Sequence, residues 1–247
     1  MSALVNALDT YERRARLYPM LLVLLPAVLG AASWLPAGAD VGGLLGGAVF
    51  SLVLAAFLGQ IARDQGKKRE PDLFRDWGGK PSVIALSYEG AFFDTKTLRR
   101  IHRSIRNIDD TLTFPENGEE EAAHRESAFT NYESASELLL SRTRDRDRFR
   151  LVFSENINYG YRRNLWAMRG SGLLLAVLGV AASVARLVHL SVTDLSTNWT
   201  AVVGVVIGLV LVVMWELRVR KSWVRIAADA FARQLCLAAQ AIPKEER

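Results

Sequence analysis

Long uncharged apolar runs alternate along this chain with segments that carry almost all of its charge. The runs occupy residues 17–39, 41–62, 170–185 and 195–215, and the third continues past one arginine to residue 192. About 20 apolar residues in a helix cross the hydrocarbon core of a bilayer. The pattern therefore predicts an all-α integral membrane protein with four transmembrane helices and helical cytoplasmic extensions.

The order of these runs divides the chain into four predicted parts. They are an N-terminal helix with a first transmembrane hairpin (1–62), a cytoplasmic helical region (63–163), a second transmembrane hairpin (164–217) and a cytoplasmic C-terminal helix (218–247). Within the charged regions the residue patterns predict a turn at 76–81, a strand or extended segment at 82–88, helices at 95–108, 119–142 and 143–168, and a straight continuation of the fourth span to 240.

Residues 95–108 have the clearest amphipathic pattern outside the apolar runs. Asp94 is a suitable N-cap, and one stripe is apolar: Leu98, Ile101, Ile105 and Ile108. The other face is basic: Lys96, Arg99, Arg100, Arg103 and Arg106. That face could pair with the acidic loop that follows, lie on anionic headgroups or hold a nucleotide. The whole cytoplasmic region (63–163) has few Val, Ile and Leu residues for a core of its own, so we expect it to pack against the tail helix or other subunits.

Basic residues border only one end of each apolar run. The four clusters are Arg13, Arg14 and Arg16; Arg63, Lys67, Lys68 and Arg69; Arg162, Arg163 and Arg169; and Arg218, Arg220, Lys221 and Arg225. The two remaining connections contain no Lys or Arg, only Asp40 and Asp194. Cytoplasmic loops are enriched in Lys and Arg. We therefore expect a multi-pass membrane protein with both termini and residues 63–163 in the cytoplasm.

Tryptophans lie near both ends of the predicted spans. Trp34 and Trp199 are near the outer ends, and Trp166 and Trp215 are near the inner ends. Indole rings favour the headgroup region of a membrane. These positions agree with the predicted span boundaries.

Composition adds little to this picture. The net charge is +5, but the excess flanks the apolar runs, so it favours membrane anchoring, and we expect no nucleic-acid partner. The single cysteine, Cys236, excludes an intrachain disulfide.

Signatures of catalysis are missing from the sequence. It has no P-loop, no H-E-x-x-H, no G-x-S-x-G and no dinucleotide fingerprint, and His102, His124 and His189 are isolated. We expect no enzyme activity, no catalytic residues, no metal and no cofactor. The acids Asp109, Asp110 and Glu119–Glu121 could bind a divalent cation, although a solvated loop explains them more simply.

Residues 155–164, directly before the third run, form the main candidate site. Its members for ligand sensing or gating are Glu155, Asn156, Tyr159, Tyr161, Arg162, Arg163 and Asn164. An interfacial belt explains the tyrosines and arginines, but it explains the acid and amides less well. Just upstream, residues 142–148 alternate Arg with Asp or Thr. This predicts an exposed, salt-bridged helix face, or else a docking surface for a neighbouring subunit or an anionic ligand.

Polar and small residues inside or beside the runs are further candidates. Arg186, His189 and Glu216 are the membrane polar group. We expect Arg186 to snorkel or to pair with Asp40 or Asp194; a pore-lining role is the alternative. Close helix packing is predicted at the small-xxx-small spacings formed by Gly42, Gly43, Gly46, Gly47, Gly204 and Gly208.

The layout of four spans with a modest charged cytoplasmic part resembles the SMODS-associated four-transmembrane effectors of bacterial defence. Trp77-Gly78-Gly79 and residues 155–164 also look like an uncharacterised bacterial membrane-protein family. The resemblance implies a homo-oligomeric channel or pore-forming effector of the bacterial inner (plasma) membrane, gated by its cytoplasmic region and used in antiviral defence. Its expected partners are the lipid bilayer, further copies of the chain, and a cytosolic protein or nucleotide signal.

Two other functions remain open at the sequence level. The first is a membrane anchor or scaffold that recruits a cytosolic partner through the charged helices. The second, which the missing motifs disfavour, is a membrane enzyme acting on lipid. The spans are almost wholly apolar, and this counts against a pore lined by polar side chains.

Overall fold

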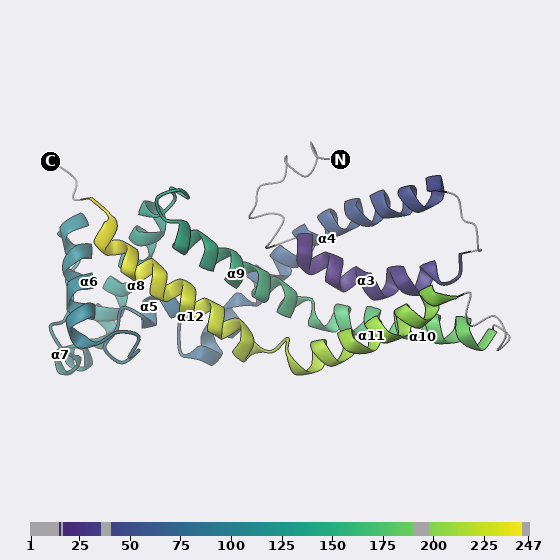
Figure 1. The fold of residues 1–247 in the computed structure, drawn as a ribbon. Coiled ribbons are helices and arrows are strands. Elements are labelled where there is room, and N and C mark those ends of the chain that lie inside the picture. The colour runs from purple at the N-terminus through teal and green to yellow at the C-terminus, as the bar shows by residue number, and fades with distance from the viewer. Residues whose placement is uncertain (1–14, 16, 36–40, 190–197, 244–247) are drawn as a thin grey trace. The chain divides into compact units, whose positions relative to one another are not determined.

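Helices are the only regular secondary structure in the described part of the chain. The computed structural model describes residues 15, 17–35, 41–189 and 198–243, with the side chains of 41–45 left aside. The α-helices are α3 (Tyr18–Ala32), α4 (Val41–Trp77), α5 (Pro81–Ile84), α6 (Thr95–Ile108), α7 (Gly118–Ala123), α8 (Arg125–Arg142), α9 (Arg150–Ala167), α10 (Arg169–His189), α11 (Trp199–Leu217) and α12 (Lys221–Ala238), followed by the 3₁₀ turn η3 (Ala239–Ala241) (Figure 1). The predicted fold class is confirmed to this extent.

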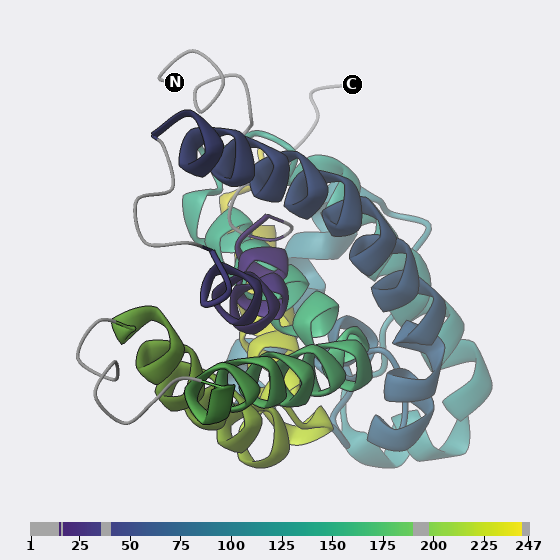
Figure 2. The same cartoon turned by 90° about the vertical axis from the view of Figure 1, so that its right-hand side faces the viewer.

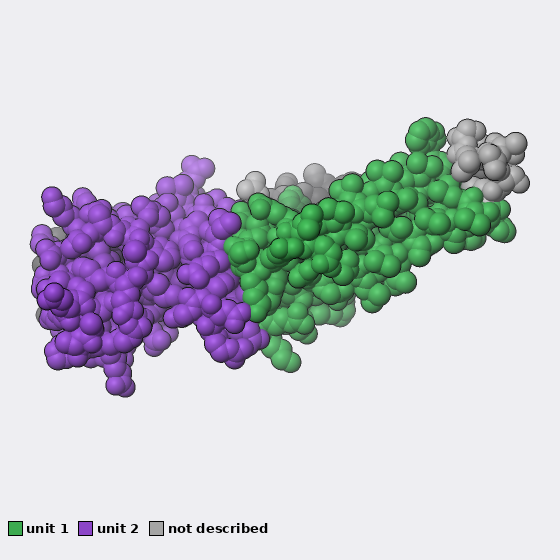
Figure 3. Space-filling view, turned by 90° about the horizontal axis from the view of Figure 1, so that it is seen from below, with its two compact units in different colours: residues 1–70, 160–224 green, residues 71–159, 225–247 purple. Residues whose placement is uncertain are grey.

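Contacts divide the chain into two compact units, coloured separately in Figure 3. Unit 1 comprises residues 1–70 and 160–224, and unit 2 comprises 71–159 and 225–247. The boundaries fall inside α4, α9 and α12, so each of these helices contributes to both units. Each unit has its own buried cluster of apolar side chains.

Among the described residues, three helices are long and apolar enough to cross a membrane. They are α4, α10 and α11. The predicted first span is shorter than expected: α3 has 15 residues, which makes it about 22 Å long, against about 30 Å of hydrocarbon. It ends in a turn at Ser33, whose Oγ donates to the Gly30 carbonyl at 2.7 Å. Residues 36–39 of the predicted span lie outside the described residues.

The helices of unit 1 are arranged around α3. It packs against both α10 and α11, which also pack along one another. Figures 1 and 2 both show α3 between the start of α4 and the α10–α11 pair. The buried cluster of this unit includes Met20, Val23, Leu211 and Trp215.

Unit 2 has a core of large apolar side chains. Leu86, Ile101, Tyr132 and Leu139 are fully buried in it. The tail helix contributes Leu235 to the same cluster. This confirms that the charged region packs against the tail helix.

The amphipathic helix predicted at 95–108 is confirmed as α6, and Asp94 caps it. The Asp94 carboxylate accepts from the backbone N–H groups of Lys96 and Thr97, each at 3.0 Å. The strand considered at 82–88 is wrong, because α5 occupies Pro81–Ile84. Proline at the first helical position favours a helix start, and successive carbonyls of this segment accept local turn bonds.

Three further predicted helices have different limits in the structure. Predicted helix 119–142 is interrupted at His124, which separates α7 from α8. Predicted helix 143–168 begins only at Arg150. The tail does not continue the fourth span, because a turn at 218–220 separates α11 from α12. Val219 in that turn is fully buried in the unit 1 cluster, and packing of this apolar side chain accompanies the break.

Candidate functional site

The predicted sensing patch lies on α9, with residues 155–159 in unit 2 and 160–164 in unit 1. Its two most buried polar members hold unit 1 together. Arg163 Nη1 lies 2.7 Å from Glu70 Oε1, and both side chains are largely buried. Asn164 Nδ2 donates to the Ala15 carbonyl at 2.9 Å. A Cβ on Gly66 would lie 2.6 Å from Asn164 Oδ1, so a larger residue at this position would displace the Asn164 side chain.

Other basic residues beside the spans bind main-chain carbonyls at helix ends. Arg162 Nη1 donates to the Trp223 carbonyl at 2.9 Å, and its guanidinium lies 5.0 Å from the Trp223 ring centre. Arg69 Nη1 donates to the Ala167 carbonyl at 3.0 Å. Arg169 donates to the Trp215 carbonyl and lies 2.8 Å from Glu216. Ala167 and Trp215 lie in the last turns of α9 and α11, so Arg69 and Arg169 satisfy carbonyls that a helix C-terminus leaves without an intrahelical partner.

Three of the remaining patch residues, Glu155, Tyr159 and Tyr161, also contact neighbouring side chains. Tyr161 meets the Trp223 ring edge-on at 6.4 Å. Tyr159 is buried and lies parallel to Phe231 at the same separation. Asn158 donates to Glu155 at 3.3 Å, while Glu155 and Asn156 are half-buried. The patch as a whole therefore makes structural contacts instead of converging on one hollow.

Arg186 makes a contact that sequence reasoning missed. Its guanidinium lies 5.5 Å from the centre of the Trp34 ring, a cation–π arrangement. Trp34 Nε1 donates to the Ala182 carbonyl at 3.1 Å, and the His189 ring lies 5.9 Å from the indole. The two acids predicted as partners, Asp40 and Asp194, lie outside the described residues. The sequence signal that could have predicted this contact was the aromatic residue at each outer span end.

The predicted packing glycines divide into two groups. A Cβ on Gly204 or Gly208 would overlap Ser183 or Val180, so close packing there is confirmed. A Cβ on Gly46 or Gly47 would meet nothing within 4 Å, and the side-chain environment of Gly42 and Gly43 is outside the described part. The structure adds three close approaches on other helices, at Gly30, Gly172 and Gly179.

Unit 2 buries a polar cluster that the sequence did not reveal. Glu121 is fully buried. Its carboxylate accepts from Tyr132 Oη at 2.6 Å and from the Tyr88 backbone N–H at 2.8 Å. Burial, then the bond to Glu121, raises the pKa of Tyr132. In the sequence Glu121 is one of three consecutive acids, so nothing distinguished it from its exposed neighbours.

His102 lies in the same core. Its Nε2 donates to the Leu86 carbonyl at 2.8 Å, because a carbonyl can only accept. Nδ1 is then the unprotonated nitrogen, and it is buried without a partner among the described residues. The ring stacks on Phe114 at 4.5 Å. Burial lowers the pKa of His102 to about 4, so the imidazole is neutral at neutral pH.

The basic face of α6 does not pair with the acidic loop in the way the sequence suggested. Arg99 donates to the main-chain carbonyl of Glu116, not to a carboxylate. Arg100 bonds Thr97 of its own helix. Lys96, Arg103 and Arg106 are exposed. Among the described residues no ion pair joins this face to an acid.

The segment with alternating charge is a loop, which corrects the predicted helix face. The Asp145 carboxylate accepts from the backbone N–H groups of Asp147 and Arg148. Arg148 lies over the Phe149 ring and donates to the Ala241 carbonyl. Asp145 therefore stabilises the turn that precedes α9. Hydrogen bonds from an Asp side chain to nearby backbone groups compete with helix formation.

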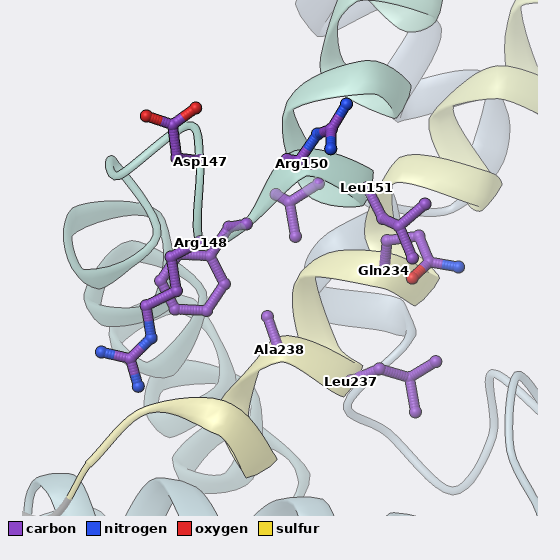
Figure 4. Close-up of a pocket in the computed structure, with 9 residues that line it drawn as sticks. Asp147, Arg148, Arg150, Leu151, Gln234, Leu237 and Ala238 are labelled. Atoms are coloured by element: carbon purple, nitrogen blue, oxygen red, sulfur yellow. The ribbon is translucent and has the colours of Figure 1, made fainter.

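This loop borders a hollow of about 260 Å³ in unit 2. It is lined by the end of the loop, the start of α9 and one face of α12: Asp147, Arg148, Phe149, Arg150, Leu151, Val152, Gln234, Leu237 and Ala238. Figure 4 shows Asp147 and Arg150 at the top of the view and Leu237 at the bottom, with Ala238 between them. No group of three or more potential metal-ligating side chains occurs in the residues that the structure covers.

Comparison with known proteins adds no family. The chain matches no protein-family model, no curated protein and no solved structure.

Proposed function

We propose that this chain is a multi-pass anchor of the bacterial inner membrane that recruits a cytosolic protein through unit 2. The observation that supports this most is how the polar residues beside the apolar helices are used. Arg162, Arg163, Asn164 and Arg169 bond partners within unit 1. Side chains fixed in this way suit a stable anchor better than a gate.

The proposed topology has four spans. Three are α4, α10 and α11, and the fourth is α3 with the residues that follow it. Both termini and residues 63–163 lie in the cytoplasm. The basic clusters at one end of every apolar run support this orientation.

Cysteine labelling tests the topology. In a Cys236→Ala background, cysteines placed at Gly38 and Ser196 should react with an impermeant thiol reagent added to intact cells. A cysteine at the exposed Asn117 should react only after the membrane is permeabilised. Labelling of position 117 in intact cells would refute the four-span arrangement.

Quantitative comparison of membrane fractions tests the recruiting role. Membranes from cells with and without the whole chain should differ in at least one otherwise cytosolic protein, which becomes several-fold more membrane-associated when the chain is present. Identical membrane proteomes would count against the anchor role.

A homo-oligomeric channel or pore-forming effector is the second candidate, and one observation favours it. Gly46 and Gly47 on α4 are unpacked, and Phe50, Val53 and Phe57 beside them are about two-thirds exposed. A small-residue helix face of this kind suits a second copy of the same helix in lipid. Lipid covers such a face equally well when the chain is a monomer.

Two measurements separate the candidates. A pore should give discrete conductance steps when the purified protein is reconstituted in planar bilayers, and Gly46→Leu should abolish them along with the oligomer. Gly170→Leu is the matched control, because Gly170 also faces open space. A monodisperse monomer by mass measurement, with no conductance, would exclude the channel and leave the anchor.

A further inference from the structure

The hollow in unit 2 has an exposed apolar side chain on its lining. Leu151, at the start of α9, is 68% exposed. It is the most exposed large apolar side chain of unit 2 among the described residues; the others are Leu140 at 38% and Ile226 at 59%. Leu151 lines the hollow together with Leu237 and Ala238 of α12. An exposed leucine beside other apolar side chains is a common feature of interaction surfaces.

Positive charge dominates the rim of this hollow. Arg148 and Arg150 both line it. Arg150 is exposed and has no ion-pair partner among the described residues. The single acid of the lining is Asp147, and the nearby Asp145 carboxylate is already bonded to backbone N–H groups. The rim therefore favours an acidic ligand.

The shape favours a peptide over a small molecule. A small-molecule site is usually a cleft of about 300–1,000 Å³ with convergent polar groups. This hollow is about 260 Å³, and its lining provides one amide, Gln234, beside the charged rim. An amphipathic helix, by contrast, binds through a few apolar anchors and flanking charges.

We propose that the hollow lined by Leu151, Leu237 and Ala238 binds an amphipathic helix with acidic flanks, carried by a cytosolic protein. Apolar side chains of that helix contact the leucines, and its carboxylates pair with Arg148 and Arg150. This inference rests on the proposed anchor function, because it names the surface and the partner chemistry through which recruitment occurs.

A displayed library of random 16-residue peptides tests the specificity. The full-length protein is held in zwitterionic lipid nanodiscs, and bound peptides are sequenced. We expect enrichment of Asp and Glu flanking apolar residues at i and i+4 spacing. Enrichment of basic peptides, or failure to enrich any peptide class, would overturn the proposal.

Matched variants locate the binding. Leu151→Asp should weaken binding of the selected peptides about tenfold or more, as expected for a central apolar anchor. Ile226→Asp is its control, since Ile226 is similarly exposed but does not line the hollow. Equal loss in both variants, or full binding to Leu151→Asp, would contradict the assignment.

Charge reversal provides an independent readout. Arg150→Glu should weaken acidic peptides and shift the selection toward basic ones, whereas Arg103→Glu on α6 should leave it unchanged. Anionic lipid is the competing ligand. The variant Arg150→Glu distinguishes the two ligands. If it binds acidic peptides normally but no longer binds phosphatidylglycerol vesicles, the hollow contacts membrane and the peptide proposal fails.

Failure of this inference is distinct from failure of the anchor function. If a cytosolic protein still moves to the membrane in cells carrying Leu151→Asp, the anchor role stands and only the binding surface is wrong. If no protein moves in cells carrying the wild-type chain, the anchor role fails whatever the peptide selection gives.

Discussion

The two units differ in how closely their helices approach one another. In unit 1 the helices approach closely where glycines remove side chains, as at Gly30, Gly179 and Gly204. In unit 2 large side chains such as Tyr132, Ile101 and Leu139 fill the space between helices. Lipid chains are as apolar as leucine, so helices in a membrane gain mainly from close packing. In water the burial of large apolar side chains is itself the driving force.

The units also differ in how they bury charge. Unit 1 pairs Arg163 with Glu70, an ion pair that is largely buried. Unit 2 holds Glu121 with a tyrosine hydroxyl and backbone N–H groups, with the neutral His102 in the same core. Removal of one group therefore has different consequences in the two units, and this can be measured.

The largest effect should come from filling a glycine contact in unit 1. A Cβ on Gly179 would overlap the main-chain carbonyl of Pro26. Because main chain cannot rotate away, Gly179→Ala must separate α3 from α10, at a cost of about 3 kcal/mol or more. The expected result is a large drop in the thermal midpoint in detergent, or loss of folded protein.

Gly170→Ala is the matched control for this change. Gly170 is on the same helix and meets nothing within 4 Å. Its replacement should leave the midpoint almost unchanged. An equal drop in both variants would show that helix propensity, not the α3–α10 contact, determines the effect.

The next largest effect should come from breaking the buried ion pair. Arg163→Ala removes the Arg163 counter-charge from the Glu70 carboxylate. The cost should be about 3 kcal/mol, at the lower end of the range for a fully buried pair, because Glu70 keeps some contact with solvent. The exposed pair Arg125–Glu89 in unit 2 is the comparison, and Arg125→Ala should change stability little because solvent screens that pair. Unfolding by denaturant in detergent measures both. Similar losses of unfolding free energy in the two variants would contradict the idea that burial makes the Arg163–Glu70 pair more important than the exposed pair.

Helices with a regular pattern of apolar residues were predictable from the sequence. The apolar stripe and the N-cap gave α6 its limits, and the uncharged runs located α4, α10 and α11. The breaks were not predictable in the same way. The end of α11 depends on burial of Val219, and the break at 143–149 depends on Asp145 bonding to its own backbone. The first is a tertiary contact and the second is a local hydrogen bond. Neither produces a recognisable pattern in the sequence.

Candidate sites were predicted by residue type, but the structure gives several of these residues another use. Arg163 and Asn164 were predicted as site residues because they are polar and lie beside a span. In the structure their polar groups bond Glu70 and the Ala15 carbonyl. Glu121 and His102 had no signal, because burial of single residues in a charged region cannot be seen from spacing. The hollow needs two segments far apart in the sequence, 147–152 and 234–238, which only the fold brings together.

A pH-dependent effect should be confined to unit 2. Burial lowers the pKa of His102 from its ordinary value of 6.5 to about 4 in the folded chain. Between these values the unfolded chain binds the proton and the folded chain does not. The contribution of His102 should therefore lower stability by about 3 kcal/mol as pH drops from 6.5 to 4, with no further loss from this residue below that range.

Variants assign that pH dependence to one residue. His102→Phe keeps a ring against Phe114 but cannot titrate, so its stability should vary less between pH 6.5 and 4. His124→Gln should retain the wild-type slope. Glu121, Arg106 and Glu116 also influence His102, so the informative quantity is the difference in slope between the variants, measured by denaturant unfolding at each pH.

The smallest effect on stability should come from Cys236, which nevertheless reports on the core of unit 2. The thiol is fully buried, and burial raises its pKa to about 12. Since the thiolate is the reactive form, maleimide should label the folded protein far more slowly than a cysteine introduced at the exposed position 151 in a Cys236→Ala chain. Cys236→Ala itself should cost about 1 kcal/mol or less, because it removes one small group. If labelling accelerates in the Tyr132→Phe variant but not in Gly179→Ala, the two units open independently; acceleration in both would mean that packing in unit 1 also controls access to the core of unit 2.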